Sequence, residues 1–251
     1  MRIATWNIAA GHKLQSSTPL AYAEQDLSYF IDQLRRIDCD VICLQEAENR
    51  PDTGYSMAKD IADQLGIDYI FETLTHPSHI RKNALLSLAI ISKNPLTETI
   101  ATPQPYPSFP LTLPDGNPAK KHVKYLQHAK IDGIMVANVH TQPLEFLGTP
   151  YESDLGKEYA EELNQLFIRE LQRPLIFTGD FCADLHTSHV ANIYTRTCET
   201  LQLTDILPPG QTKPFNKGRS DAIFVSPELT TTDSSITETM TDHFLCWATI
   251  Q

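Results

Sequence analysis

The chain has 251 residues, of which 41% are hydrophobic and 20% are charged, values typical of a globular protein that buries a sizeable core. Its formal net charge of −11 weighs against a protein that binds long nucleic acids non-specifically through a basic surface. A protein of this charge can still bind phosphate groups through a bound cation.

The five cysteines have irregular spacings, which are not typical of a disulfide framework, and Cys39 and Cys43 lack the further ligands of a zinc site. Residues 1–10 carry one arginine and no long apolar run, so we expect no signal peptide. The longest apolar stretch, around Leu85–Ile91, is too short to cross a bilayer. These features predict a cytoplasmic protein without a membrane segment, and nothing in the sequence implies a protein partner.

Short apolar runs alternate with helical periodicity in the first half of the chain. Apolar residues recur at helical spacing from Leu27 to Ile37 and predict a helix over Ala21–Ile37. A second helix is predicted over Ser56–Leu65. The predicted strands of this half are Arg2–Ile8, Val41–Leu44, Asp68–Glu72 and Ala84–Ile91.

The second half begins with a proline-rich segment, Pro103–Pro118, which we expect to be an extended loop that is either a surface excursion or a wall of a substrate site. Asp132-Gly133 then predicts a tight hairpin. The predicted strands are Tyr125–Ile131, Ile134–Val139, Leu175–Thr178, Asp221–Val225, Thr230–Glu238 and Leu245–Ile250, and the predicted helices are Leu155–Leu171 and Val190–Leu201. Strands outnumber helices, which favours packed sheets with helices outside, in one domain over residues 1–251.

Polar side chains of a few types stand at the ends of these predicted strands. Each has an ordinary structural explanation when it is considered alone, as a turn residue, a helix cap or a structural histidine. Considered together, carboxylate and amide oxygens are the ligands that Mg²⁺ prefers, and a histidine oriented by an aspartate is a common general base. The residues are Asn7, Glu46, His140, Asp180, Asp221, Asp242 and His243.

The ordered series TWN, LQE, NVH, GDF, SDAIFV and TDH resembles the endonuclease/exonuclease/phosphatase superfamily from Thr5 to His243, and Arg81–Ser87 resembles a further segment of that family. The resemblance implies a deoxyribonuclease I-like α/β (α+β) fold. This fold is a four-layer sandwich of two mainly antiparallel β-sheets flanked by α-helices. It also implies a phosphoesterase that depends on a divalent metal and uses Mg²⁺, with Mn²⁺ as the alternative.

The resemblance also assigns expected roles around the metal and the attacking water. Glu46 would be the principal metal ligand, with Asn7 and Asp242 beside the metal. Asp180 would orient or deprotonate the water, and His243 would contact the phosphate as the acid/base partner.

Further roles follow for the residues around this centre. Asp221 would orient His243, and His140 would bind a phosphate oxygen or assist the leaving group. Asn83 and Arg81 would line the substrate site. Cys182 departs from the family pattern, which has asparagine there, and a thiol is a weaker hydrogen-bond donor to a phosphate.

The substrate class stays open at this point. A small phosphodiester or an inositol or sugar phosphate suits the negative charge, whereas the family also contains nucleases. The run Lys120–Lys124 is either a basic patch for nucleic acid or a solvated surface segment. A degenerate, non-catalytic member that binds phosphorylated ligands or a protein partner is the alternative, and Cys182 is its only support.

Overall fold

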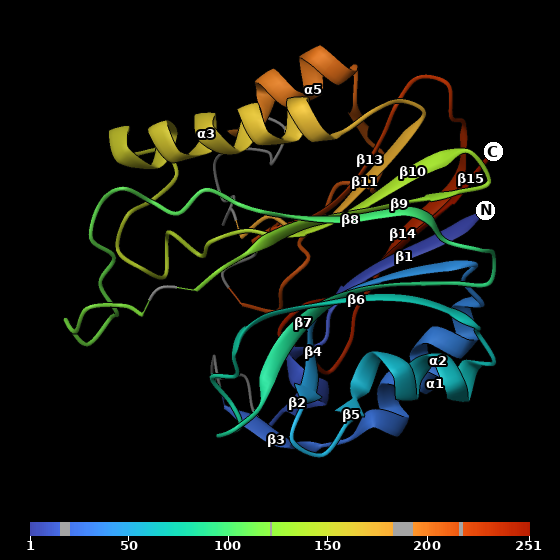
Figure 1. Cartoon of the computed structure of the whole chain (residues 1–251), viewed down its shortest axis with the longest axis horizontal. Coiled ribbons are helices and arrows are strands. Elements are labelled where there is room, and N and C mark those ends of the chain that lie inside the picture. Colours follow the sequence, from blue (N-terminus) through green and yellow to red (C-terminus); the bar gives the residue numbers. More distant parts are fainter. Residues whose placement is uncertain (16–20, 121, 183–192, 216–217) are drawn as a thin grey trace.

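A computed structural model describes residues 1–15, 21–120, 122–182, 193–215 and 218–251 of the chain. Two β-sheets lie face to face, and helices cover the outer face of each sheet (Figure 1). In the described part of the chain, the strand pairs β1–β4 and β10–β11 are parallel and the other pairs are antiparallel. The predicted four-layer sandwich is confirmed.

The first sheet has the order β14-β15-β1-β4-β7-β6, and β5 pairs with β4. Its strands are β14 (Thr231–Thr237), β15 (Leu245–Ile250), β1 (Arg2–Asn7), β4 (Val41–Arg50), β7 (Leu85–Ser92), β6 (Tyr69–Pro77) and β5 (Tyr55–Ser56). A short hairpin, β2 (His12–Leu14) with β3 (Tyr22–Gln25), follows the 3₁₀ turn Ala9–Gly11.

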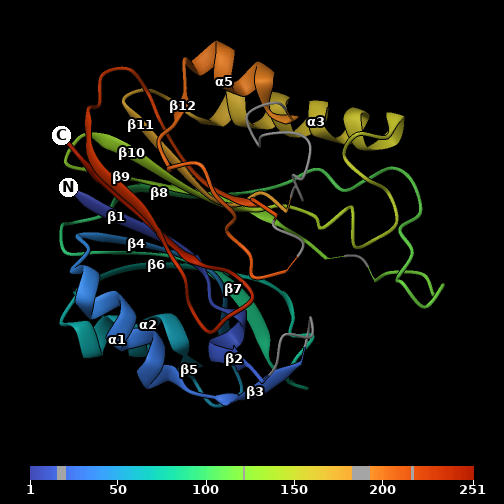
Figure 2. The same cartoon turned by 180° about the vertical axis from the view of Figure 1, so that it is seen from behind.

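The second sheet has the order β12-β13-β11-β10-β9-β8. Its strands are β12 (Thr204–Asp205), β13 (Asp221–Val225), β11 (Leu175–Asp180), β10 (Ile134–His140), β9 (Tyr125–Ile131) and β8 (Thr97–Pro103). The two chain ends lie close together at one end of the sandwich, where the N-terminal amine donates to the carbonyl of Ile250 (Figure 2).

The helices and sheets enclose separate apolar layers. Helices α1 (Leu27–Ile37) and α2 (Met57–Leu65) pack on the first sheet, and α3 (Asp154–Glu170) and α5 (Thr195–Leu201) pack on the second. A third apolar cluster fills the space between the sheets. No helix among the described residues is long and apolar enough to cross a membrane.

Several predicted boundaries were wrong. Residues Tyr22–Gln25 form β3, and α1 begins after Asp26, whose carboxylate accepts from the backbone N–H of Tyr29. Strand β8 was missed because it is an edge strand without an alternating apolar pattern. In the predicted helix Val190–Leu201, residues 190–192 lie outside the described residues, and α5 covers Thr195–Leu201.

The proline-rich loop packs on the α3 side of the second sheet. Tyr106, Phe109 and Leu111 contact the apolar cluster under α3. The side-chain amide of Gln104 donates to the carbonyls of Tyr125 and His140. This loop therefore supports the end of β10.

Two buried amides join the facing sheets. The Nε2 atom of Gln45 on β4 donates to Oδ1 of Asn138 on β10 over 2.7 Å and to the hydroxyl of Thr5 over 3.0 Å. The Nδ2 atom of Asn138 donates to the carbonyls of Leu44 and Ala89 across the interface. Because both amides are fully buried, their geometry restricts how one sheet can sit on the other.

We predict that Asn138→Ala lowers the free energy of unfolding by about 1–3 kcal/mol, because it removes one acceptor of Gln45 Nε2 and the side-chain donor to the buried carbonyls of Leu44 and Ala89. Urea unfolding followed by circular dichroism measures this change. The control Gln165→Ala removes an exposed amide from α3 and is expected to change stability little. Equal stability of the Asn138 variant and wild type would contradict a structural role for the amide pair.

Candidate active site

The parallel strand pairs bring chemically active side chains to one edge of the sandwich. In the first sheet, Asn7 ends β1 opposite Gln45 of β4. In the second sheet, His140 ends β10 opposite Asp180, which ends β11. Asp221 begins the antiparallel strand β13 directly opposite Asp180. The two sheets thus each contribute part of one cluster.

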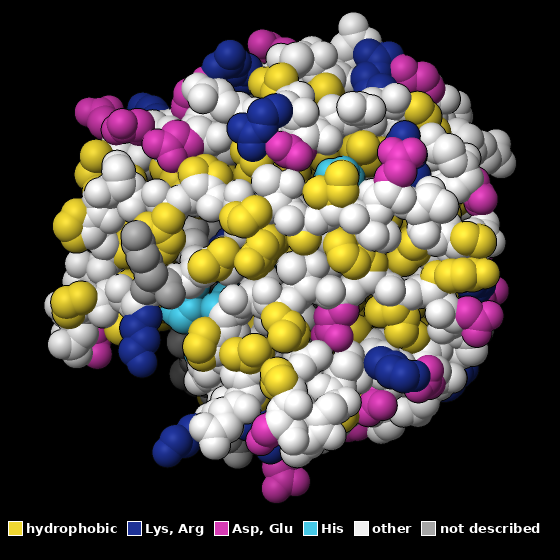
Figure 3. All heavy atoms as spheres, viewed as in Figure 1, with side chains coloured by type: hydrophobic (Ala, Val, Ile, Leu, Met, Phe, Trp, Pro, Cys, Tyr) yellow, Lys and Arg dark blue, Asp and Glu magenta, His cyan; other side chains and the backbone are white. Residues whose placement is uncertain are grey.

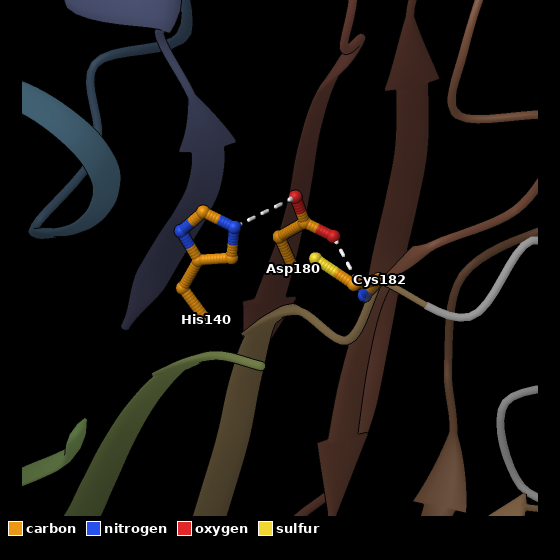
Figure 4. A group of neighbouring side chains, drawn as sticks. All are labelled: His140, Asp180 and Cys182. Atoms are coloured by element: carbon orange, nitrogen blue, oxygen red, sulfur yellow. Dashed lines mark hydrogen bonds and ion pairs between the residues drawn. The ribbon is translucent and has the colours of Figure 1, made fainter. Parts of the chain in front are cut away.

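Asp180 lies at the centre of this cluster and is almost fully buried. Its Oδ2 atom accepts a hydrogen bond from the amide of Asn7 over 3.1 Å, and it lies 3.5 Å from Nε2 of His243 and 3.7 Å from Nε2 of His140. Its Oδ1 atom accepts from the backbone N–H of Cys182 over 2.8 Å (Figure 4). Three other segments of the chain, and the backbone that follows Asp180, therefore surround this carboxylate.

Burial on its own raises the pKa of Asp180, but the charge of His243 and the hydrogen bond from Asn7 lower it below its ordinary value. Burial also lowers the pKa of His140 well below the usual range, and the neighbouring charge of Lys124 adds to this shift. At neutral pH, the centre therefore holds an ionised Asp180 beside a neutral His140.

Asp221 orients the second histidine. The carboxylate oxygens of Asp221 lie 2.9 and 3.0 Å from Nδ1 of His243, so Nδ1–H donates to Asp221 and Nε2 faces Asp180. Asp221 itself accepts from the hydroxyl of Ser220. Burial lowers the pKa of His243, but the charges of Asp221 and Asp180 outweigh it and raise this pKa to about 9.

The backbone of His243 is also held in place. The indole Nε1 of Trp6 on β1 donates to the carbonyl of His243 over 3.0 Å. The Trp6 ring in turn packs against Phe30 of α1, with ring centroids 4.8 Å apart. The tryptophan beside Asn7 thus connects the helical layer to the loop that carries His243.

A β-bulge places Glu46. The pairing of β4 with β7 shifts register between Leu44 and Ala47, and Glu46 adopts a φ of 55° in the left-handed region. A bulge of this kind redirects a side chain out of the strand alternation. The Glu46 carboxylate, with 13% of its side chain exposed, lies 3.8 Å from Nε2 of His140.

One carboxylate oxygen of Asp242 lacks a hydrogen-bond partner among the described residues. Its Oδ2 atom accepts from the hydroxyl of Tyr22 over 2.7 Å, whereas its Oδ1 atom is buried and has no hydrogen-bond partner among the described residues. Burial and the charges of Asp242 and Glu46 together raise the pKa of Tyr22, so both carboxylates lie near this phenol. A buried, unpartnered carboxylate oxygen near a second carboxylate suits a hard divalent cation.

The three predicted metal residues are arranged differently from one another. Glu46 and Asp242 present carboxylates near Tyr22, but the Asn7 amide donates to Asp180 and its oxygen accepts from the backbone N–H of Ala9. Ligand-type atoms within 4.8 Å of one another occur in two groups of the described residues, and both contain Asp180. These groups are His140 with Asp180 and Cys182, and Asp180 with Asp221 and His243.

Two of the residues predicted to bind substrate are not hydrogen-bonded to the cluster in the described structure. Arg81 and Asn83 are exposed on the loop between β6 and β7. The guanidinium of Arg81 pairs with Glu48, a fully buried residue of β4 that also pairs with Arg50. In the described structure, neither Arg81 nor Asn83 has a hydrogen bond to a member of the cluster.

The interpretation of Lys120–Lys124 as an exposed basic run was wrong for Lys124. Its side chain is buried, and its Nζ atom lies 3.1 Å from Nε2 of His76 and 3.2 Å from both ring nitrogens of His140. Lys121 lies outside the described residues, whereas Lys120 is exposed. The available signal was the position of Lys124 directly before β9, whose first residues pair with the end of β10 that carries His140.

Comparisons with known proteins identify the family and the fold of the chain. The sequence model of the endonuclease/exonuclease/phosphatase family matches residues 4–246. None of the curated proteins is significantly similar to the chain in sequence.

Similar solved structures extend over the entire chain. An endonuclease/exonuclease/phosphatase from Beutenbergia cavernae DSM 12333 has a TM-score of 0.76 at 17% identity and is covered over 71% of its length. A family protein from Leptotrichia buccalis C-1013-b has a TM-score of 0.71 at 17% identity and is covered over 99%. An AP endonuclease from Archaeoglobus fulgidus has a TM-score of 0.60 at 16% identity, again with 99% covered.

All three similarities cover 100% of the present chain and concern its fold. Because the family match extends over nearly the whole sequence, the chain belongs to the endonuclease/exonuclease/phosphatase family of phosphoester hydrolases.

Proposed function

We propose that the chain is a phosphoesterase that depends on a divalent metal and hydrolyses a phosphodiester or phosphomonoester bond by in-line attack of water. The observation that carries this proposal is the arrangement around Asp180. Its buried carboxylate faces Nε2 of His243, and Asp221 holds the opposite ring nitrogen. An aspartate, a histidine and an orienting carboxylate in this order supply a positioned base and a positioned cation.

The metal residues in the proposal are Glu46 and Asp242, with Asn7 beside them. Their oxygens suit Mg²⁺, or Mn²⁺ as the alternative, and the unpartnered Oδ1 of Asp242 supports this assignment. A bound Mg²⁺ supplies positive charge to a non-bridging phosphate oxygen. Asn7 holds Asp180 through its amide, so it orients the water-activating carboxylate as well.

The proposal assigns the remaining roles to three side chains of the cluster. Asp180 accepts a proton from the attacking water or orients it. His243 keeps a proton on Nδ1 toward Asp221 and presents Nε2–H to the phosphoryl group, because its pKa is raised. His140 lies between Glu46 and Asp180 and contacts a phosphate oxygen or the leaving group.

A small phosphoester is the substrate class that the charge favours. The net charge is −11, and acidic and basic side chains are interspersed over the face shown in Figure 3. Histidine side chains lie inside a notch at one edge of that face (Figure 3). A protein that binds a long nucleic acid along its surface by electrostatic attraction would need a more basic surface than this. Nuclease activity is the alternative, and a similar structure is that of an AP endonuclease.

A non-catalytic protein that binds phosphorylated ligands is the second candidate, and Cys182 favours it. Burial raises the pKa of the Cys182 thiol well above its usual value, so it stays neutral and donates weakly. The backbone N–H of Cys182 nevertheless still orients Asp180. The substitution therefore removes one side-chain donor and leaves the carboxylate in place.

The first prediction concerns turnover itself. With Mg²⁺, wild type is expected to hydrolyse at least one of bis-p-nitrophenyl phosphate, p-nitrophenyl phosphate, inositol phosphates, sphingomyelin, RNA, and single- or double-stranded DNA, and EDTA is expected to abolish this. Asp180→Asn keeps the size of the side chain and is expected to lower kcat about 10²–10⁴-fold, because the carboxylate is the proposed base. Glu46→Gln is expected to raise the Mg²⁺ concentration needed for half-maximal rate.

Arg173→Gln is the control, because it changes an exposed ion pair with Glu228. Metal binding by calorimetry without turnover on any substrate would favour the non-catalytic candidate. Full turnover by Asp180→Asn would refute the assigned mechanism.

The second prediction concerns pH. Because the pKa of His243 is raised to about 9, the stability that its charge contributes is fully present below the ordinary pKa of about 6.5 and is lost as pH rises through about 9. The rate is expected to fall over the same alkaline range, because the imidazolium contacts the phosphate. Asp221→Asn removes the charge that raises this pKa, so the alkaline limb of the kcat/KM profile is expected to move to lower pH.

Ser220→Ala removes only a hydroxyl that donates to Asp221 and is expected to leave this limb nearly in place. An unchanged limb in Asp221→Asn would show that His243 does not control the alkaline loss.

A further inference from the structure

Lys124 is a buried cation at the edge of the proposed active site. It directly precedes β9, and only 4% of its surface is exposed. Its Nζ atom lies 3.1 Å from His76 of β6 and 3.2 Å from His140 of β10. The lysine thus bridges a strand of the first sheet and a strand of the second sheet.

The direction of the first hydrogen bond follows from the surroundings of His76. The Nδ1 atom of His76 lies 3.0 Å from the carbonyl of Pro77 and must donate to it. The pKa of His76 is lowered to about 2 by burial and by the charge of Lys124, so the ring is neutral and Nε2 is an acceptor. Lys124 therefore donates one N–H to His76, and it donates another to the neutral ring of His140.

A structural salt bridge does not explain the burial of this charge. Among the described residues, no carboxylate lies within ion-pair distance of Lys124, and its close partners are two neutral imidazoles. Burial lowers the pKa of Lys124, and the carboxylates that oppose this shift are Glu46 and Asp180, both proposed members of the active centre. A buried ammonium without a direct ion pair is costly for stability, which favours a role in the site.

We propose that Lys124 is a positioning residue of this active site, whose ammonium is anchored on His76 and orients the His140 ring between Glu46 and Asp180. An ammonium has three N–H donors, and the two imidazoles use two of them. The positive charge also offsets the carboxylates of Glu46 and Asp180. This inference rests on the proposed phosphoesterase function.

Lys124→Met tests the proposal, because methionine fills a similar volume without charge or donors. We expect kcat to fall by about 10–100-fold, as for other residues that orient active-site groups, with a smaller change in KM. The melting temperature is expected to stay equal or rise, since an apolar side chain replaces a buried charge. The matched control is Lys130→Met at the far end of β9, which removes a surface ion pair with Glu98. Wild-type kcat in a folded Lys124→Met would overturn the proposal.

A second measurement does not depend on turnover. The ring ¹⁵N chemical shifts of histidine report hydrogen bonding, and a His140→Gln variant assigns the His140 signals. We expect these signals to move in Lys124→Met and to stay in Lys130→Met. Unchanged His140 signals would overturn the proposal even if wild type had no phosphoesterase activity, so the two hypotheses fail separately. If Lys124→Met does not fold, Lys124→Leu, which also lacks charge and donors, is measured in the same way with the same two outcomes.

Discussion

The hydrogen-bonded amide pair Gln45 and Asn138 is the contact on which the arrangement of the site depends. Asn7 and Glu46 come from the first sheet, whereas His140 and Asp180 come from the second. Apolar contacts between two sheet faces are not directional, whereas buried amides that donate to particular acceptors require one relative position of the sheets. Gln45 directly precedes Glu46, and Asn138 lies two residues before His140. The hydrogen bond between the two amides therefore aligns the two halves of the cluster.

Electrostatics then divides the cluster into two sides around Asp180. On one side, Asp221 holds His243 as a cation with a raised pKa. On the other side, burial and Lys124 keep His140 neutral between Asp180 and Glu46. The two histidines therefore differ in charge although both face the same carboxylate. In the proposed mechanism, His243 contacts the phosphate as a cation and His140 is a neutral hydrogen-bonding group.

Most strands and helices could be predicted because their apolar periodicity matches their final burial. The errors occur where packing overrides local pattern. Strand β3 lies within the predicted helix Ala21–Ile37, directly before α1. The only local mark of the boundary is Asp26, which caps the N-terminus of α1. Strand β8 is exposed along most of its length, and it forms because its backbone pairs with the edge of β9. Strand β4 continues past Leu44 because a bulge accommodates Glu46 without ending the ladder.

The sequence by itself determined the family, the layer architecture and the identity of the side chains around Asp180, because each stands at the end of an apolar strand within a recognisable motif. It did not determine which of these groups touch. Only the tertiary structure revealed that Asn7 holds Asp180, that Tyr22 holds Asp242, and that Arg81 pairs with Glu48. It also decided that Lys124 is buried beside His140. These contacts join segments far apart in the chain, so they depend on how the chain folds and the two sheets stack. Local residue patterns do not show which distant segments will meet.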